Sequence, residues 1–173
     1  MRIGAHVSAA GGLANAVATA RRLQCETFQV FVSNPRGWAL PPFDPGGDER
    51  FRELAAAAGL RPVFIHAPYL VNFASTSDQF RERSRALVAA TLARGAAMGA
   101  AGVVVHANDS AEPAGACRDH HARVGTGAIG LTGFLAILAH PGLARLPVVI
   151  ETPGSDQERA ADIARLKALR PPC

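Results

Sequence analysis

Short apolar runs alternate with segments of helical character along the whole chain, and this alternation restricts the fold more than any other feature. Strands are predicted at Ile3–Ser8, Thr27–Ser33, Val63–His66, Val103–His106 and Pro147–Glu151. Helices are predicted at Leu13–Leu23, Glu49–Ala58, Ser77–Met98, Ile129–Ala139 and Ser155–Leu169. Asp48 is the predicted cap of the second helix, and the proline- and glycine-rich segment 34–47 before it is predicted to be a loop. A strand followed by a helix, repeated about five times, predicts an α/β fold with parallel strands and right-handed crossovers.

The composition fits one folded domain over residues 1–173. Hydrophobic residues make up 49% of the chain and charged residues 18%, which argues against disorder. The net charge is +4, a weak indication of nucleic acid or phosphorylated substrates, although the excess of arginine fits genome composition equally well.

The cysteines and the apolar runs exclude two other classes. Three widely spaced cysteines, Cys25, Cys117 and Cys173, indicate neither a disulfide framework nor a Cys-x-x-Cys zinc site. The N-terminal MRIGAHVS is predicted to be a strand and not a signal peptide. Arg94 interrupts the longest apolar stretch, so no membrane span and no membrane partner are expected. We therefore expect a soluble cytoplasmic protein.

Four of the five predicted strands carry a metal-ligating residue at or near the carboxyl end. These residues are His6, His66, His106 and Glu151. In a parallel array these ends lie on one face of the sheet, and imidazole with carboxylate is the ligand type that holds zinc or manganese. A single histidine at a strand end is more often structural, but the combination would be a costly cluster of polar groups without a compensating ion.

The polar loop between Gly102 and Gly127 adds further ligand types. It carries Asp119 and His121, whose spacing puts both side chains on one side of an extended segment, whereas His120 is expected to face away. His140 precedes a proline in a loop that ends a helix, and we expect it to be structural. Neither a Rossmann nor a P-loop glycine pattern is present in GAHVSAAGG at residues 4–12.

Several motifs, in order along the chain, resemble those of the endonuclease IV family of apurinic/apyrimidinic endonucleases. They are GAHVSAAGG at residues 4–12, NPRGW at 34–38, HAPYLVN at 66–72, HANDS at 106–110, DHH at 119–121 with GTG at 125–127, and VIET at 149–152. The resemblance covers nearly the whole chain.

The resemblance implies a TIM barrel that holds three Zn²⁺ ions and hydrolyses the phosphodiester 5′ to an abasic site in double-stranded DNA during base excision repair. It makes His66, His106, Asp119, His121 and Glu151 metal ligands, with Glu151 and His106 as the catalytic residues. It also assigns contacts with DNA to a second set of residues, namely His6, Arg36, Trp38 and Tyr69.

The chain departs from the family pattern by an internal shortening. The run before His106 resembles the fourth strand of the barrel, whereas the residues after it resemble the region of the seventh strand. The expected fold is therefore an incomplete TIM-barrel-like parallel array of about five βα units, lacking the central part of the barrel. Five ligands cannot fill three sites, so fewer zinc ions are expected. An open edge would favour self-association.

Three functions remain open. The first is a zinc-dependent phosphodiesterase of the endonuclease IV type, and the second is a catalytically impaired remnant that retains DNA or metal binding only. The third, a xylose-isomerase-like sugar isomerase on the same barrel, is disfavoured by the NPRGW loop and the Asp-x-His loop.

Overall fold

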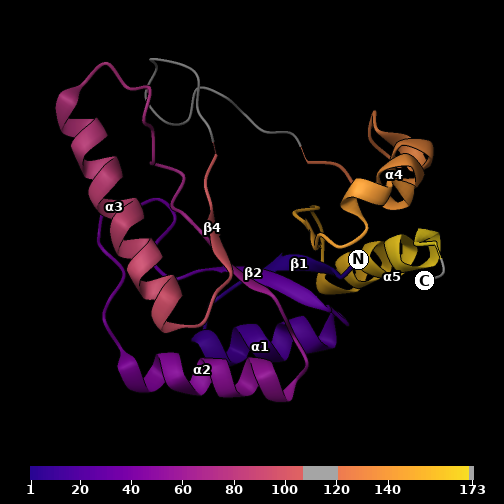
Figure 1. The fold of residues 1–173 in the computed structure, drawn as a ribbon, viewed down its shortest axis with the longest axis horizontal. Coiled ribbons are helices and arrows are strands. Elements are labelled where there is room, and N and C mark those ends of the chain that lie inside the picture. Colours follow the sequence, from indigo (N-terminus) through magenta and orange to yellow (C-terminus); the bar gives the residue numbers. More distant parts are fainter. Residues whose placement is uncertain (107–120, 172–173) are drawn as a thin grey trace.

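The strands of the described residues form one parallel sheet, curved into an open half-barrel (Figure 1). The structure is a computed structural model and describes residues 1–106 and 121–171. The strands are β1 (Ile3–Val7), β2 (Thr27–Phe31), β3 (Val63–His66), β4 (Gly102–Val104) and β5 (Val148–Ile150), in the order β4-β3-β2-β1-β5. The prediction of an incomplete parallel βα array is confirmed.

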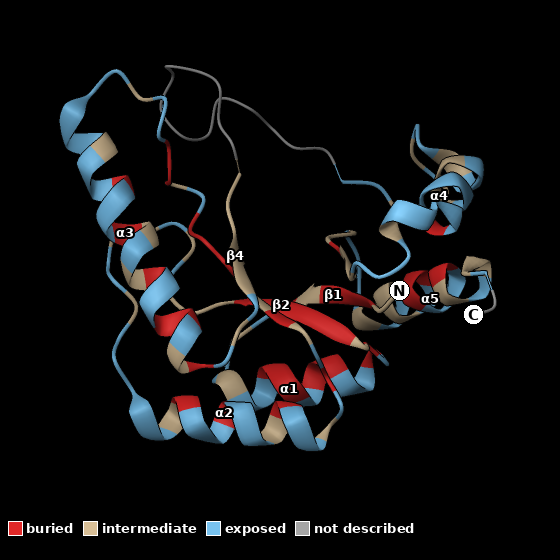
Figure 2. Ribbon diagram, viewed as in Figure 1, coloured by how far each residue is buried: buried red, intermediate tan, exposed pale blue. Residues whose placement is uncertain are grey.

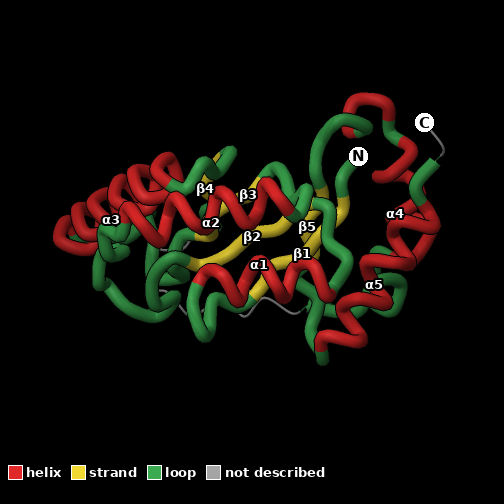
Figure 3. The backbone as a smooth tube through the Cα atoms, turned by 90° about the horizontal axis from the view of Figure 1, so that it is seen from below, coloured by secondary structure: helices red, strands yellow, loops and turns green. Residues whose placement is uncertain are grey.

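Helices cover the outer side of this sheet. They are α1 (Leu13–Arg22), α2 (Pro45–Ala57), α3 (Asp78–Ala97), α4 (Gly130–Ala139) and α5 (Asp156–Leu169), and a short 3₁₀ turn spans Pro141–Leu143. Seen from below, α1 and α2 lie side by side across the strands, with α3 beyond them on the β4 side and α4 and α5 on the β5 side (Figure 3). No helix within the described ranges is both long and apolar enough to cross a bilayer.

The main core lies between the outer face of the sheet and the helices. Alternate strand residues point outward and are fully buried there, including Ile3, Phe28 and Ile65. Figure 2 shows this burial along β1, β2 and the sheet-facing sides of the helices. Gly4 is required where β1 pairs with β2, because a Cβ at that position would lie 1.7 Å from the carbonyl oxygen of Thr27 on β2.

The predicted start of α2 is wrong. The cap is Asp44, which accepts a hydrogen bond from the backbone N–H of Gly47, and Pro45 occupies the first helical turn. Asp48 instead lies inside the helix and is buried, where it pairs with Arg94 of α3 at 2.7 Å. The segment 34–47 is consequently a loop only as far as Asp44.

Two edges and one helix face are open on this fold. Among the described strands, β4 and β5 each pair with one neighbour only. Large apolar side chains of α4 and its flanks are exposed, and they are Ile129, Leu131, Leu135, Ile137 and Leu146. A full barrel would cover such surfaces, so they mark where the half-barrel ends.

Candidate metal centre on the inner face of the half-barrel

The inner face of the sheet carries the polar residues because side chains alternate along each strand. The register pairs His6 of β1 with Gln29 of β2, and Phe31 of β2 with His66 of β3. Strand β5 runs beside β1, and Glu151 follows it directly. The same periodicity that buries Ile3 and Ala5 on the outside therefore sends these polar side chains inward.

Three of these residues come close enough to share one ion. Ligand atoms of His6, His66 and Glu151 all lie within 4.8 Å of one another. A Glu151 carboxylate oxygen lies 3.7 Å from Nδ1 of His6 and 3.6 Å from Nε2 of His66. Two imidazoles and a carboxylate that converge in this way can hold a divalent cation.

A contact with the backbone fixes the orientation of the His66 ring. Its Nδ1 lies 2.6 Å from the carbonyl oxygen of Ala67, an acceptor, so Nδ1 carries the proton and Nε2 presents a lone pair to the cluster. That Nε2 lies 3.0 Å from Nε2 of His106, which follows β4. His106 therefore joins the cluster through His66.

Gln29 is a polar neighbour of the cluster that belongs to none of the sequence motifs. Its side-chain amide lies 2.9 Å from Nδ1 of His6 and also hydrogen-bonds to the carboxylate of Glu151. The sequence contains a signal for it, because Gln29 is the one polar residue in the apolar run from Phe28 to Val32. Such contacts orient metal ligands from outside the coordination sphere.

Aromatic rings line one side of the cluster. The ring of Phe31 contacts both histidines, with centroids 4.6 Å from His6 and 4.8 Å from His66. Tyr69 lies 5.5 Å from His66 and 6.1 Å from His106, and it is 45% exposed.

The ionisation states favour cation binding. Hydrogen bonding with the His6 imidazole, supported by the charges of His66 and His106, lowers the pKa of Glu151 to about 2. Burial lowers the pKa of His66 below its usual value. Glu151 is therefore an anion and His66 a neutral ligand at neutral pH, which are the forms that bind metal ions.

A cavity of about 410 Å³ continues from the cluster along the inner face. It is lined by Gln29, Phe64, Val104, His121, Pro147, Val149 and Glu151. His121 thus faces the same cavity as Glu151 but lies outside the three-residue cluster. Asp119 and His120 lie outside the described residues.

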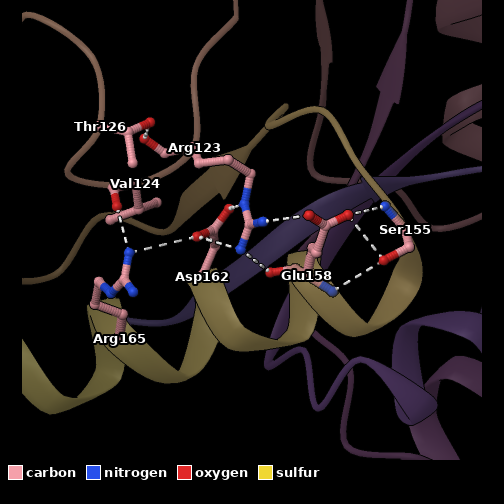
Figure 4. A network of polar contacts seen from close by, with 7 residues as sticks. All are labelled: Arg123, Val124, Thr126, Ser155, Glu158, Asp162 and Arg165. Atoms are coloured by element: carbon pink, nitrogen blue, oxygen red, sulfur yellow. Dashed lines mark hydrogen bonds and ion pairs between the residues drawn. The ribbon is translucent and has the colours of Figure 1, made fainter.

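A polar network fixes the chain just after His121 onto α5 (Figure 4). Arg123 donates from Nε to the buried carboxylate of Asp162 at 2.6 Å and pairs with Glu158 at 2.9 Å. Arg165 donates to the carbonyl oxygen of Val124 at 2.6 Å. These contacts set the position from which His121 reaches the cavity.

The remaining predicted residues lie around the rim or away from the centre. Arg36 is exposed on the loop after β2, whereas Trp38 is half-buried against α3. His140 accepts a hydrogen bond from the backbone N–H of Gly142 at Nδ1 and is exposed, as expected for a structural histidine.

Comparison with known proteins places this geometry in a family. A family profile described as Xylose isomerase-like TIM barrel matches residues 17–107. "Probable endonuclease 4" of Streptomyces coelicolor is 32% identical, over 97% of this chain and 95% of the relative. The chain belongs to the endonuclease IV family. A second "Probable endonuclease 4", from Streptomyces avermitilis, is 29% identical over 97% of the chain and 90% of its own length.

The fold agrees with a solved member of the endonuclease IV family. Superposition on the crystal structure of endonuclease IV from Thermus thermophilus gives a TM-score of 0.85 at 23% identity, covering 98% of both chains. The alignment with the Streptomyces coelicolor relative runs over 279 positions, against 173 residues in this chain. The relative therefore has a long segment that this chain lacks, which explains the open half-barrel.

Proposed function

We propose that this chain is a metal-dependent phosphodiesterase of the endonuclease IV type, which cleaves DNA 5′ to abasic sites. The observation that carries the proposal is the convergence of His6, His66 and Glu151 within 4.8 Å on the inner face of the half-barrel. Relatives named "Probable endonuclease 4" support this activity, and they argue against the sugar isomerase.

The donor set fits one Zn²⁺ ion. His6, His66 and Glu151 provide three ligands, as in many catalytic zinc sites, and His106 contacts Nε2 of His66 beside them. When bound, zinc supplies Lewis acidity toward a phosphodiester and lowers the pKa of water. In this proposal His6 is a metal ligand, which differs from the DNA contact that the sequence motifs suggested.

The protein's own residues would hold and orient the reacting groups. Gln29 fixes the carboxylate of Glu151 and the ring of His6, so that both face the same point. Because the Nδ1 proton of His66 is held by the carbonyl oxygen of Ala67, the proton between the two Nε2 atoms belongs to His106. In this proposal the anionic Glu151 supplies negative charge at the site, and His106 carries a proton that it can transfer during hydrolysis.

Contacts with DNA would come from the rim of the half-barrel. Arg36 is exposed there, and the backbone N–H of Tyr69 donates to the carbonyl oxygen of Pro35, the residue before Arg36. Because the ring of Tyr69 lies 5.5 Å from that of His66, a DNA backbone held by Arg36 would pass near the cluster. Contacts of this kind recognise phosphates and deformed shape and do not read sequence. His121, on the shared cavity, and Asp119 are retained as ligands of a second, weaker ion.

A second candidate function is DNA or metal binding without catalysis. It is favoured by the single three-residue cluster found in the described part of the chain, where the family resemblance implies three ions. A site with one ion can bind a phosphate and yet lack the second cation that stabilises the leaving oxygen.

A nicking assay combined with metal analysis tests the proposal. The purified protein should contain about one Zn²⁺ per chain by mass spectrometry and should nick a duplex that contains an abasic site. We expect His66→Ala and Glu151→Gln to abolish both nicking and zinc retention, whereas His140→Ala should preserve them. Tight duplex binding without product at any zinc concentration would support the binding-only alternative.

A further inference from the structure

We propose that Arg83 of α3 is a positioning residue, which holds Trp38 in place and thereby fixes Arg36 for contact with the DNA backbone. The inference rests on the proposed function, because it concerns the loop through which that function would engage DNA. It also assigns Trp38 a different role from the DNA contact suggested by its motif, since Trp38 becomes the anchor of the loop.

Trp38 is packed against the first turns of α3. The guanidinium carbon of Arg83 lies 4.7 Å from the centroid of the indole ring, within the range of a cation–π interaction. Phe80 meets the same ring edge-on at 5.5 Å. Phe80 and Arg83 are three residues apart and so share one face of the helix. Trp38 also packs on the small core cluster of Ala67, Val71 and Leu87.

Arg83 differs from its arginine neighbours on α3. Arg81 pairs with Asp78 and Arg85 with Glu82, each one helical turn away. Among the described residues, no carboxylate lies within ion-pair distance of Arg83, whose guanidinium contacts the ring of Trp38. This guanidinium is therefore committed to the aromatic ring and not to a surface ion pair.

The loop that carries Arg36 is short and fixed at several points. The side-chain oxygen of Asn34 accepts a hydrogen bond from the backbone N–H of Arg36 at 2.9 Å. The backbone carbonyl oxygen of Asn34 accepts a second one from the backbone N–H of Gly37 at 3.1 Å. The backbone N–H of Tyr69 donates to the carbonyl oxygen of Pro35 at 3.0 Å. Trp38 follows Arg36 in the chain and holds the C-terminal side of the loop against α3. Among these contacts, it is the only side-chain contact between the loop and α3, so releasing its ring frees that side of the loop.

The physical consequence is preorganisation. Arg36 is exposed, and an exposed arginine loses considerable freedom when it binds a phosphate. A rigid loop reduces that loss because its backbone is already ordered in the free protein. Removing a cation–π contact at an exposed site should weaken duplex binding by about two- to fivefold through this loss of order.

The single tryptophan of the chain makes the contact directly measurable. All tryptophan fluorescence reports on Trp38, so Arg83→Gln should increase quenching of that emission by acrylamide. Arg83→Lys keeps the cation and should restore the wild-type value. Arg85→Gln removes the same charge two residues away and should leave the emission unchanged. Unchanged emission in Arg83→Gln would overturn the inference.

A double-mutant cycle on DNA binding completes the test. Anisotropy is measured in the presence of Zn²⁺ with a labelled duplex that carries a tetrahydrofuran abasic analogue and, on its 5′ side, a phosphorothioate linkage that resists cleavage. Arg83→Gln should weaken binding in the wild-type background but not in an Arg36→Gln background, whereas Arg85→Gln should have the same effect in both. Additive effects of Arg83→Gln and Arg36→Gln would refute positioning while leaving the proposed function intact. Failure of the wild-type chain to bind the duplex would refute the proposed function, and with it the role of Arg36 in contacting DNA.

Discussion

Replacing Glu151 by Gln should change how the stability of the metal-free protein depends on pH. The neighbouring His6 imidazole lowers the pKa of Glu151 from 4.5 to about 2. The full shift corresponds to about 3 kcal/mol of folding free energy, and because 24% of the side chain is exposed we expect about 2 kcal/mol.

The sign follows from proton binding. A depressed pKa means that the folded protein binds fewer protons than the unfolded chain, so Glu151 stabilises the fold fully above pH 4.5. This contribution disappears as the pH falls from 4.5 toward 2. His66 also destabilises the fold as the pH falls, and its effect begins at a higher pH. Burial lowers the pKa of His66 in the folded protein, so below about pH 6.5 the unfolded chain binds this proton more readily than the folded protein does.

Urea unfolding followed by circular dichroism, in EDTA between pH 7 and pH 2.5, measures the effect. The difference in unfolding free energy between wild type and Glu151→Gln should be about 2 kcal/mol larger at pH 7 than at pH 2.5. Glu49→Gln, on the exposed side of α2, controls for the loss of one negative charge. Parallel curves for wild type and Glu151→Gln would show that the carboxylate is not held by the histidines, and the geometry of the centre would be wrong.

Three further predictions concern other parts of the molecule. Zn²⁺ at about 100 times its dissociation constant should add about 2.7 kcal/mol, raising Tm by about 5–10 °C in calorimetry, in wild type and His140→Ala but not in His66→Ala. Asp48→Ala should cost about 3–5 kcal/mol in urea unfolding because it leaves the buried Arg94 unpaired, and the double variant with Arg94→Met should recover most of the loss. The apolar surface around α4 should cause self-association that rises with concentration in light scattering, and Leu135→Glu should reduce it; a constant monomer mass would contradict this.

The meeting of His66 and Glu151 was predictable because strand direction and strand ends are local properties. Once β-branched runs mark parallel strands, His66 at the end of β3 and Glu151 just after β5 must lie on the same face. The sheet order confirms that step, since β5 pairs with β1 although nearly the whole chain separates them. Alternation along the strand explains why His6 faces the cluster without being the last residue of β1.

Other features could not be read from local patterns. Asp48 has the sequence context of a helix cap, but its role depends on Arg94, 46 residues away, with which it forms a buried pair. Asp44 followed by Pro45 is the stronger signal for a helix start, since proline is favoured in the first helical turn. Gln29 belongs to the centre only because the register of β1 and β2 sets it opposite His6. Tertiary register decides such cases, and a sequence alone does not fix it.

The half-barrel keeps its centre because the contributing strands are neighbours in the sheet. His6, Gln29, His66 and Glu151 come from β1, β2, β3 and the end of β5, and these four strands are contiguous in the order β3-β2-β1-β5. The segment that the Streptomyces coelicolor relative has and this chain lacks therefore leaves these contacts in place. What joins Glu151 to the histidines is the parallel pairing of β5 with β1, at Ile3 to Val148 and Ala5 to Ile150. Assembly of this cluster therefore does not require a closed barrel, but it does require the pairing of β5 with β1.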